Sequence, residues 1–238
     1  MKRLLVALGA VTVVVLLAGV FAPATLVAAR VEQATGGAWR LVEARGRVWD
    51  GTATLADRGG RVAVPVAWHV EALPLLRGEA RVHLGPPGAL RADLVLRRDA
   101  VEASAAEIVL PATLLPLPPG VVAGGELRMT SDTVALVGGT TAGRVEVDWR
   151  GARLTLPGTP VIDLGTVTLQ LAAEGARWRG PLAARGGVAT LDGDVSVDGS
   201  GADLALRMVP QAGGEFLRGL GTPDAQGAIP MRLAPRWR

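Results

Sequence analysis

The chain has 238 residues, no cysteine and a single lysine, Lys2, which excludes disulfides, thiolate zinc sites, cysteine nucleophiles, a Walker lysine and a Schiff-base lysine in the body. An isoelectric point of about 10.7 is typical of nucleic-acid binders. Without Lys2 and Arg3, however, basic and acidic residues nearly balance and alternate along the chain, which argues against a phosphate-binding stripe.

The N-terminal region predicts a membrane anchor. Residues 4–22 contain no charge, and as a helix they would extend for about 28 Å, close to the ~30 Å hydrocarbon core of a bilayer. Lys2 and Arg3 precede this span, so the positive-inside rule keeps residues 1–3 in the cytoplasm. The chain is therefore expected to be a single-pass inner-membrane protein with a periplasmic body.

A cleaved signal peptide is the alternative interpretation, because Ala-Pro-Ala at 22–24 offers small residues at a suitable spacing. The apolar run is longer than the hydrophobic region of most signal peptides, and a proline inside the cleavage site is unfavourable. Retention as an anchor is the preferred reading. Residues 23–40 are then expected to form a linker with a short juxtamembrane helix, whose helical periodicity covers residues 28–35.

From residue 41 to the C-terminus the sequence predicts an all-β domain. In RVAVPVAWHVE, residues 61–71, alternation places Val64, Val66 and Trp68 on one face, and Pro65 on the other face indicates an edge or a bulge. Glycine- and proline-rich turns separate further alternating segments, at 80–84, 89–97, 143–151, 166–171, 194–198 and 203–208.

This pattern predicts a periplasmic antiparallel β-meander over residues 41–238, built as a curved or layered sheet or an open half-barrel. Weak helical periodicity adds short helical turns within 106–115 and 214–220.

Motifs for catalysis or metal binding are not recognisable. His69 and His83, the only histidines, lie on polar faces of predicted strands and are interpreted as solvated side chains. Asp192, Asp194, Ser196 and Asp198 could offer oxygen ligands to calcium. The pattern of an EF-hand loop with its terminal glutamate is missing, however, and an exposed strand face is the preferred reading. The sequence therefore predicts no enzyme, no metal, no cofactor and no nucleic-acid partner.

The segment GRVWDGTATL places Trp49 between two glycines in a chain with only 3% aromatic residues. The simpler interpretation is that Trp49 caps the core at the rim of a sheet, in a strand where Gly46 and Gly51 relax the backbone. The functional alternative is that Trp49, Trp68 and Trp149 line a groove that accepts a partner strand or a lipid chain.

Several short motifs follow one another in a fixed order: the anchor, GRVWDGTATL, VAWHVEALPLLRGEARVHL, IVLPATLL, VAGGELRM, GRVEVDWRGARL, IDLGTVTLQL, WRGPLAARGGVATLDGDVSVDGS and LRGLGTPDAQGAIPMRL. Along nearly the whole chain this order resembles protein N of the bacterial type II (general) secretion system. The resemblance implies an accessory inner-membrane component without catalytic residues. Its periplasmic β-domain would take part in assembly or protein export by contacts with other secretion components in the inner membrane and periplasm.

The residues themselves leave a second function open, an envelope protein with a lipid-binding or lipid-transfer β-groove. The alternating Val and Leu faces of an open sheet would be uncovered unless an apolar ligand such as lipid filled them.

Overall fold

The computed structural model describes residues 22–60, 63–85, 90–115, 117 and 120–234. The chain divides into two compact units, Met1–Leu96 and Arg97–Arg238. The predicted membrane span, residues 4–22, lies outside the described residues except for Ala22. Among the helices that the structure does describe, none combines the length and the apolar character needed to cross a bilayer.

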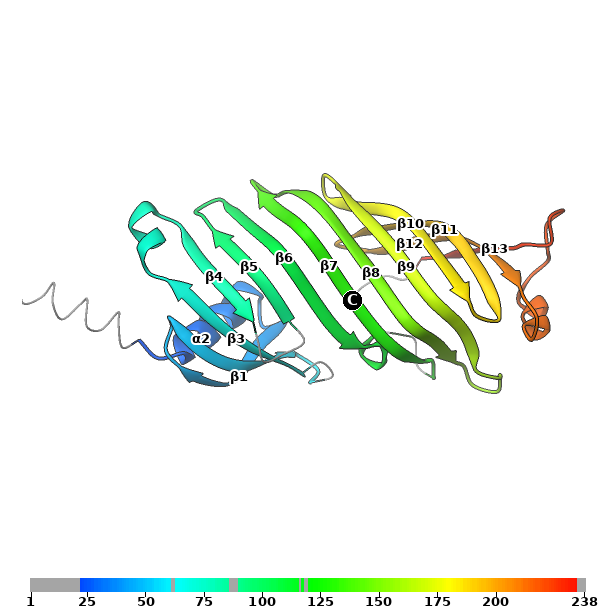
Figure 1. Ribbon diagram of the computed structural model, residues 1–238, viewed down its shortest axis with the longest axis horizontal. Coiled ribbons are helices and arrows are strands. Elements are labelled where there is room, and N and C mark those ends of the chain that lie inside the picture. Colours follow the sequence, from blue (N-terminus) through cyan, green and yellow to red (C-terminus); the bar gives the residue numbers. More distant parts are fainter. Residues whose placement is uncertain (1–21, 61–62, 86–89, 116, 118–119, 235–238) are drawn as a thin grey trace, which may run out of the picture. The chain divides into compact units, whose positions relative to one another are not determined.

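The first unit combines one helix with an antiparallel meander (Figure 1). Its elements are α2 (Thr25–Ala34), β1 (Trp39–Gly46), β2 (Asp50–Asp57), β3 (Ala63–Glu71), the 3-10 turn η1 (Leu73–Arg77), β4 (Ala80–Gly85) and β5 (Leu90–Leu96). Each of these strands pairs in antiparallel fashion with the next. The helix predicted for residues 28–35 is present as α2.

One face of this sheet is apolar, as the alternation predicted. Val64, Val66 and Trp68 of β3 are all buried. Val27 of α2 and Ala24, the residue before this helix, pack against the same face. Pro65 pairs with β2, but among the described residues the pairing of β3 with β4 begins only at Ala67. The positions that would lie opposite Pro65 on that side are outside the described residues, so the expected edge or bulge at this proline stays a prediction.

The second unit is a longer antiparallel meander. Its elements are β6 (Ala100–Pro111), η2 (Ala112–Leu114), β7 (Val122–Val137), β8 (Thr140–Thr155), β9 (Ile162–Glu174), β10 (Arg177–Gly186), β11 (Ala189–Asp198), β12 (Gly201–Pro210), η3 (Glu215–Leu220) and β13 (Ile229–Leu233). Consecutive strands pair throughout. The predicted all-β antiparallel meander is confirmed, and within the described residues the first and last strands in the order, β1 and β13, each pair with one neighbour only, so the ladder is open.

The two short helical turns expected in this unit have different outcomes. Residues 215–220 form η3, as predicted. The prediction of a helical turn within 106–115 is wrong for most of that segment. Residues 106–111 continue β6, and only Ala112–Leu114 is helical. Ile108 and Val109 pair with β7, and this ladder, together with the β preference of branched side chains, outweighs a few residues of helical spacing.

The core of the second unit lies on one face of β8–β13 beneath η3. Leu217 of η3 and Ile229 of β13 are its most deeply buried large side chains, each 1% exposed. The other buried members are Ala152, Ile162, Leu164, Val167, Ala184, Ala189, Leu191 and Met208. Since η3 contributes Leu217 to the centre of this core, the short turn is part of the packed interior of the unit.

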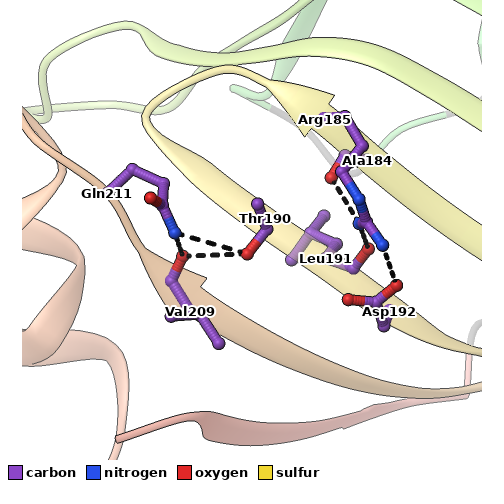
Figure 2. Close-up of polar contacts among 7 residues, drawn as sticks. All are labelled: Ala184, Arg185, Thr190, Leu191, Asp192, Val209 and Gln211. Atoms are coloured by element: carbon purple, nitrogen blue, oxygen red, sulfur yellow. Dashed lines mark hydrogen bonds and ion pairs between the residues drawn. The ribbon is translucent and has the colours of Figure 1, made fainter.

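Polar side chains tie the β10–β11 hairpin on its outer face (Figure 2). The Nη1 atom of Arg185 donates hydrogen bonds to the carbonyl oxygens of Ala184 and Leu191, both at 2.8 Å, and Nη2 forms an ion pair with Asp192. Nearby, the Gln211 amide donates to the carbonyl oxygen of Val209 at 3.3 Å. The Arg185 contacts fasten the ends of β10 and β11 where the chain reverses.

Arg185→Met is expected to destabilise the second unit only modestly, by about 1 kcal/mol. Both members of the ion pair with Asp192 are more than half exposed, so solvent screens the charge interaction, and the main loss is the hydrogen bond to the Leu191 carbonyl. Urea unfolding would measure the change, with Asp192→Asn as the matched variant that removes only the charge. A loss from Asp192→Asn as large as that from Arg185→Met would contradict this assignment.

Candidate functional site: an apolar cavity in the first unit

The first unit contains a cavity of about 520 Å³ between α2 and the apolar face of β1–β5. Every side chain in its wall is apolar. The wall consists of Val27, Val31, Leu41, Val48, Trp49, Leu55, Val66, Trp68, Val70, Leu75, Ala80, Val82, Leu84, Leu90, Leu94 and Leu96. This volume falls within the range of small-molecule pockets, about 300–1,000 Å³.

Strand register produces this wall from simple alternation. Val82 of β4 is paired with Val70 of β3 on one side and with Leu94 of β5 on the other, so the three side chains stand on the same face. Val27 and Val31 of α2 are four residues apart and therefore share the helix face that lines the cavity. The sequence pattern predicted each apolar face, while the pairing that joins them into one wall came from the structure.

Trp68 and Trp49 lie in this wall. Trp68 is 5% exposed, and its indole Nε1 donates a hydrogen bond of 3.0 Å to the carbonyl oxygen of Val48. Trp49 is half-buried and lies in the turn between β1 and β2, so the expectation that it sits within a strand is wrong.

Gly51 has a different partner from the one expected. A Cβ atom at Gly51 would lie 2.4 Å from Cζ2 of Trp68, so this glycine makes room for the Trp68 ring. The sequence linked Gly51 to Trp49, its near neighbour in the chain. The structure links it to Trp68, because Gly51 and Trp68 are paired across β2 and β3.

Trp149, the third predicted contact residue, belongs to the second unit. It is half-buried against the core of that unit, and its Nε1 donates a hydrogen bond of 2.9 Å to the carbonyl oxygen of Gly124. Trp49 and Trp68 therefore share one cavity, whereas Trp149 packs on the core of its own unit. A role for any of the three in binding a partner remains a prediction.

The histidines lie on the opposite face of the first sheet and are not isolated. His69 and His83 are paired across β3 and β4, and their rings stack with centroids 6.4 Å apart. His83 Nε2 lies 2.8 Å from Oε1 of Glu71, and Nδ1 lies 2.7 Å from Oδ1 of Asp93. Within the described residues, no group of three or more histidine or acidic side chains is arranged to hold a metal ion.

We expect His83 to titrate above the usual histidine range. Its hydrogen bond to Glu71, followed by that to Asp93, raises the pKa of His83. Glu71→Gln should therefore lower this pKa, as followed by NMR of the imidazole protons. Because the folded-state pKa exceeds the unfolded value of about 6.5, protonated His83 stabilises the fold below that pH, and the contribution disappears as the pH rises through the raised pKa. An unchanged titration in Glu71→Gln would refute the assignment.

Two of the acidic residues considered for calcium, Asp192 and Asp198, have partners within the protein. Asp192 pairs with Arg185. Asp198 accepts hydrogen bonds from the backbone N–H and the hydroxyl of Ser200, at 2.8 and 2.6 Å. The hydroxyl contact is the main reason that the pKa of Asp198 is lowered. The Asp198 contacts hold the turn between β11 and β12, whereas Asp192 joins β11 to β10, so both carboxylates have a structural role.

Comparison with known proteins agrees with the resemblance seen in the sequence. The family model for the type II secretion system (T2SS), protein N, matches residues 37–232. Curated proteins and solved structures gave no match. The matched range begins just before β1 and ends within β13. It includes the strands that line the cavity but not α2. Since this range covers most of the sequence, the chain belongs to the type II secretion system protein N family.

Proposed function

We propose that this protein is an accessory inner-membrane component of the bacterial type II secretion system, with a body that takes part in assembly or export through protein–protein contacts. The family match over residues 37–232 is the observation that carries the proposal. In this role the predicted span at 4–22 anchors the chain, and the β-sheets reach into the periplasm. The function needs no catalytic residue, cofactor or metal.

The outer edge of β1 is the contact surface that we propose. Within the described residues β1 pairs only with β2, six of its eight residues are exposed, and the Val42 side chain is 47% exposed. An edge strand presents unpaired backbone groups that an extended segment of a partner can complete. The register between β1 and β2 is irregular between Val42 and Arg45, so only a short part of β1 is a regular strand edge. A short edge restricts pairing with unrelated extended chains.

A photo-crosslinking residue at Val42 tests this surface in cells. The expected product is an adduct with another type II secretion subunit, identified by mass spectrometry. Val161, which is 53% exposed in the second unit outside any strand, is the matched control position and should give little of the same adduct. Absence of any secretion subunit from the Val42 adducts, together with normal cargo export in a deletion strain, would reject the proposal.

The natural absence of cysteine permits a direct test of topology. Ser200 is exposed in the turn between β11 and β12, so a membrane-impermeant maleimide should label Ser200→Cys in intact spheroplasts. A cysteine inserted after Met1, in a second variant that keeps Lys2 and Arg3, should react only after lysis, because the positive-inside rule keeps the N-terminus in the cytoplasm. Release of the body from the membrane fraction, or labelling of both variants before lysis, would show that the anchor is cleaved or inverted.

A second candidate function, lipid binding, is favoured by one observation, the entirely apolar cavity of the first unit. Lipid binding is compatible with a role in secretion, since a component anchored in the membrane lies next to lipid molecules.

A further inference from the structure

We propose that the cavity of the first unit binds one acyl chain of a glycerophospholipid drawn from the adjoining membrane leaflet. The proposal rests on the anchored topology proposed above only for the supply of lipid. The cavity itself is formed entirely by described residues of one unit.

The chemistry of the wall selects an apolar occupant. No polar side chain lines the cavity, and the indole N–H of Trp68 is already engaged by the Val48 carbonyl. A peptide entering this space would lose hydrogen bonds to water and find no side-chain replacements, which is costly for each backbone group. Ordered water is disfavoured for the same reason, since a buried water needs two to four polar partners. A hydrocarbon chain needs none.

The size of the cavity also fits an acyl chain. A methylene group displaces about as much volume as a water molecule in the liquid, roughly 30 Å³, so 520 Å³ accommodates on the order of 15 methylene groups. Within the wall only Val66 and Trp68 are buried, and most of the other side chains are partly exposed. An acyl chain would cover this remaining apolar surface, and each buried methylene adds to binding.

The rim of the cavity carries a feature suited to a membrane surface. Leu73 and Leu76 of η1 are 79% and 87% exposed, the most exposed large apolar side chains among the described residues. Between them, Leu75 lines the cavity, and Arg77 ends the same turn. Exposed leucines beside an arginine suit the boundary between acyl chains and phosphate headgroups. The turn η1 would thus place the mouth of the cavity at the lipid surface.

The position of α2 in the sequence agrees with this placement. Helix α2 begins at Thr25, shortly after the predicted span ends at residue 22, and it contributes Val27 and Val31 to the wall. Along α2 the rise from Thr25 to Val31 is about 9 Å, at 1.5 Å per residue. The span itself is a poor occupant, because a helix with its side chains is about 10–12 Å across and its 19 residues far exceed the available volume.

The test uses the full chain reconstituted in vesicles of phosphatidylethanolamine and phosphatidylglycerol, with a trace of phosphatidylcholine that carries a diazirine in one acyl chain. After irradiation, peptide mass spectrometry locates the lipid adducts. The expected result is labelling of cavity residues on β2–β5, separate from any labelling of residues 4–22. Labelling confined to residues 4–22 would overturn the proposal.

Two matched variants make the test specific. Ala80 and Ala63 are the first residues of β4 and β3; Ala80 lines the cavity, whereas Ala63 is exposed on the opposite face. In Ala80→Phe the phenyl ring takes the place of about three methylene groups, so labelling of β2–β5 should fall by at least about tenfold. Ala63→Phe should label like the wild type, and equal labelling of the two variants would refute the site.

Leu75→Glu provides a second route if Ala80→Phe does not fold. Leu75 is 39% exposed at the rim, so a charge there is tolerated by the fold but faces the entering chain, and labelling should again fall by about tenfold. Wild-type labelling in Leu75→Glu would count against the proposal. The vesicles contain no secretion subunit, so the lipid test does not depend on the protein contacts proposed for β1. Lipid labelling can fail while the Val42 adducts form in cells, and it can succeed while those adducts do not form. The two proposals are therefore judged separately.

Discussion

Leu217→Ala is expected to lower the free energy of unfolding of the second unit by about 3 kcal/mol. Leu217 is 1% exposed and packs from η3 into the core formed by β8–β13. Its N–H donates a hydrogen bond of 3.0 Å to the carbonyl oxygen of Gly214, which holds the start of the turn in place. Truncation removes the contacts that keep η3 on the sheet, and the remaining void cannot be filled by a neighbouring element without moving the strands.

Hydrogen exchange followed by mass spectrometry would locate this effect. Peptides from β11–β13 should exchange faster in Leu217→Ala, while peptides from β2–β4 in the first unit should be unchanged. Phe216→Ala is the matched control on the same turn, because the Phe216 side chain is 39% exposed, and its cost should stay below about 1 kcal/mol. Similar losses from the two variants would mean that η3 is not anchored through Leu217.

Much of the fold could be predicted because it depends on period-two alternation. Residues 61–71 showed their apolar face directly, and the structure buries Val64, Val66 and Trp68 there. Residues 106–111 were misread because Ile, Val and Leu follow one another directly after Glu107, without a further polar residue to mark the alternation. Their state as a strand is decided by pairing with β7, a long-range contact that no local pattern contains.

The candidate site was predictable only in part, for the same reason. Sequence alone identified Trp49 and Trp68 as unusual, and it suggested that apolar strand faces would need a cover. It could not show that Val70, Val82 and Leu94 stand side by side, since this depends on the register of two hairpins. The contact of His83 with Glu71 and Asp93 was missed because it joins three strands, although three titratable residues on polar faces of neighbouring strands were a usable signal.

Trp68→Ala is expected to cost about 3–5 kcal/mol in the first unit. The indole is 5% exposed, it forms part of the cavity wall, and its loss leaves the Val48 carbonyl without the 3.0 Å hydrogen bond. Trp68→Phe keeps an aromatic ring and should cost much less, about 1–2 kcal/mol, mainly for the unpaired carbonyl. Faster hydrogen exchange in β2–β4, with none in β11–β13, would confirm that the loss is local to this unit.

Gly51 and Trp68 should be energetically coupled, which explains the glycine that follows Trp-Asp in GRVWDGTATL. The Cβ atom of Gly51→Ala would lie 2.4 Å from the Trp68 ring and 2.8 Å from the carbonyl oxygen of Arg45. In the wild type both contacts force a shift of the strand or the ring, at a cost of about 2 kcal/mol or more. In the Trp68→Ala background only the Arg45 contact remains. The double variant should therefore lose about 1–2 kcal/mol less than the sum of the single variants. Strict additivity would mean that Gly51 is required by the backbone of β1 alone, and that the Trp68 ring has room to move within the cavity.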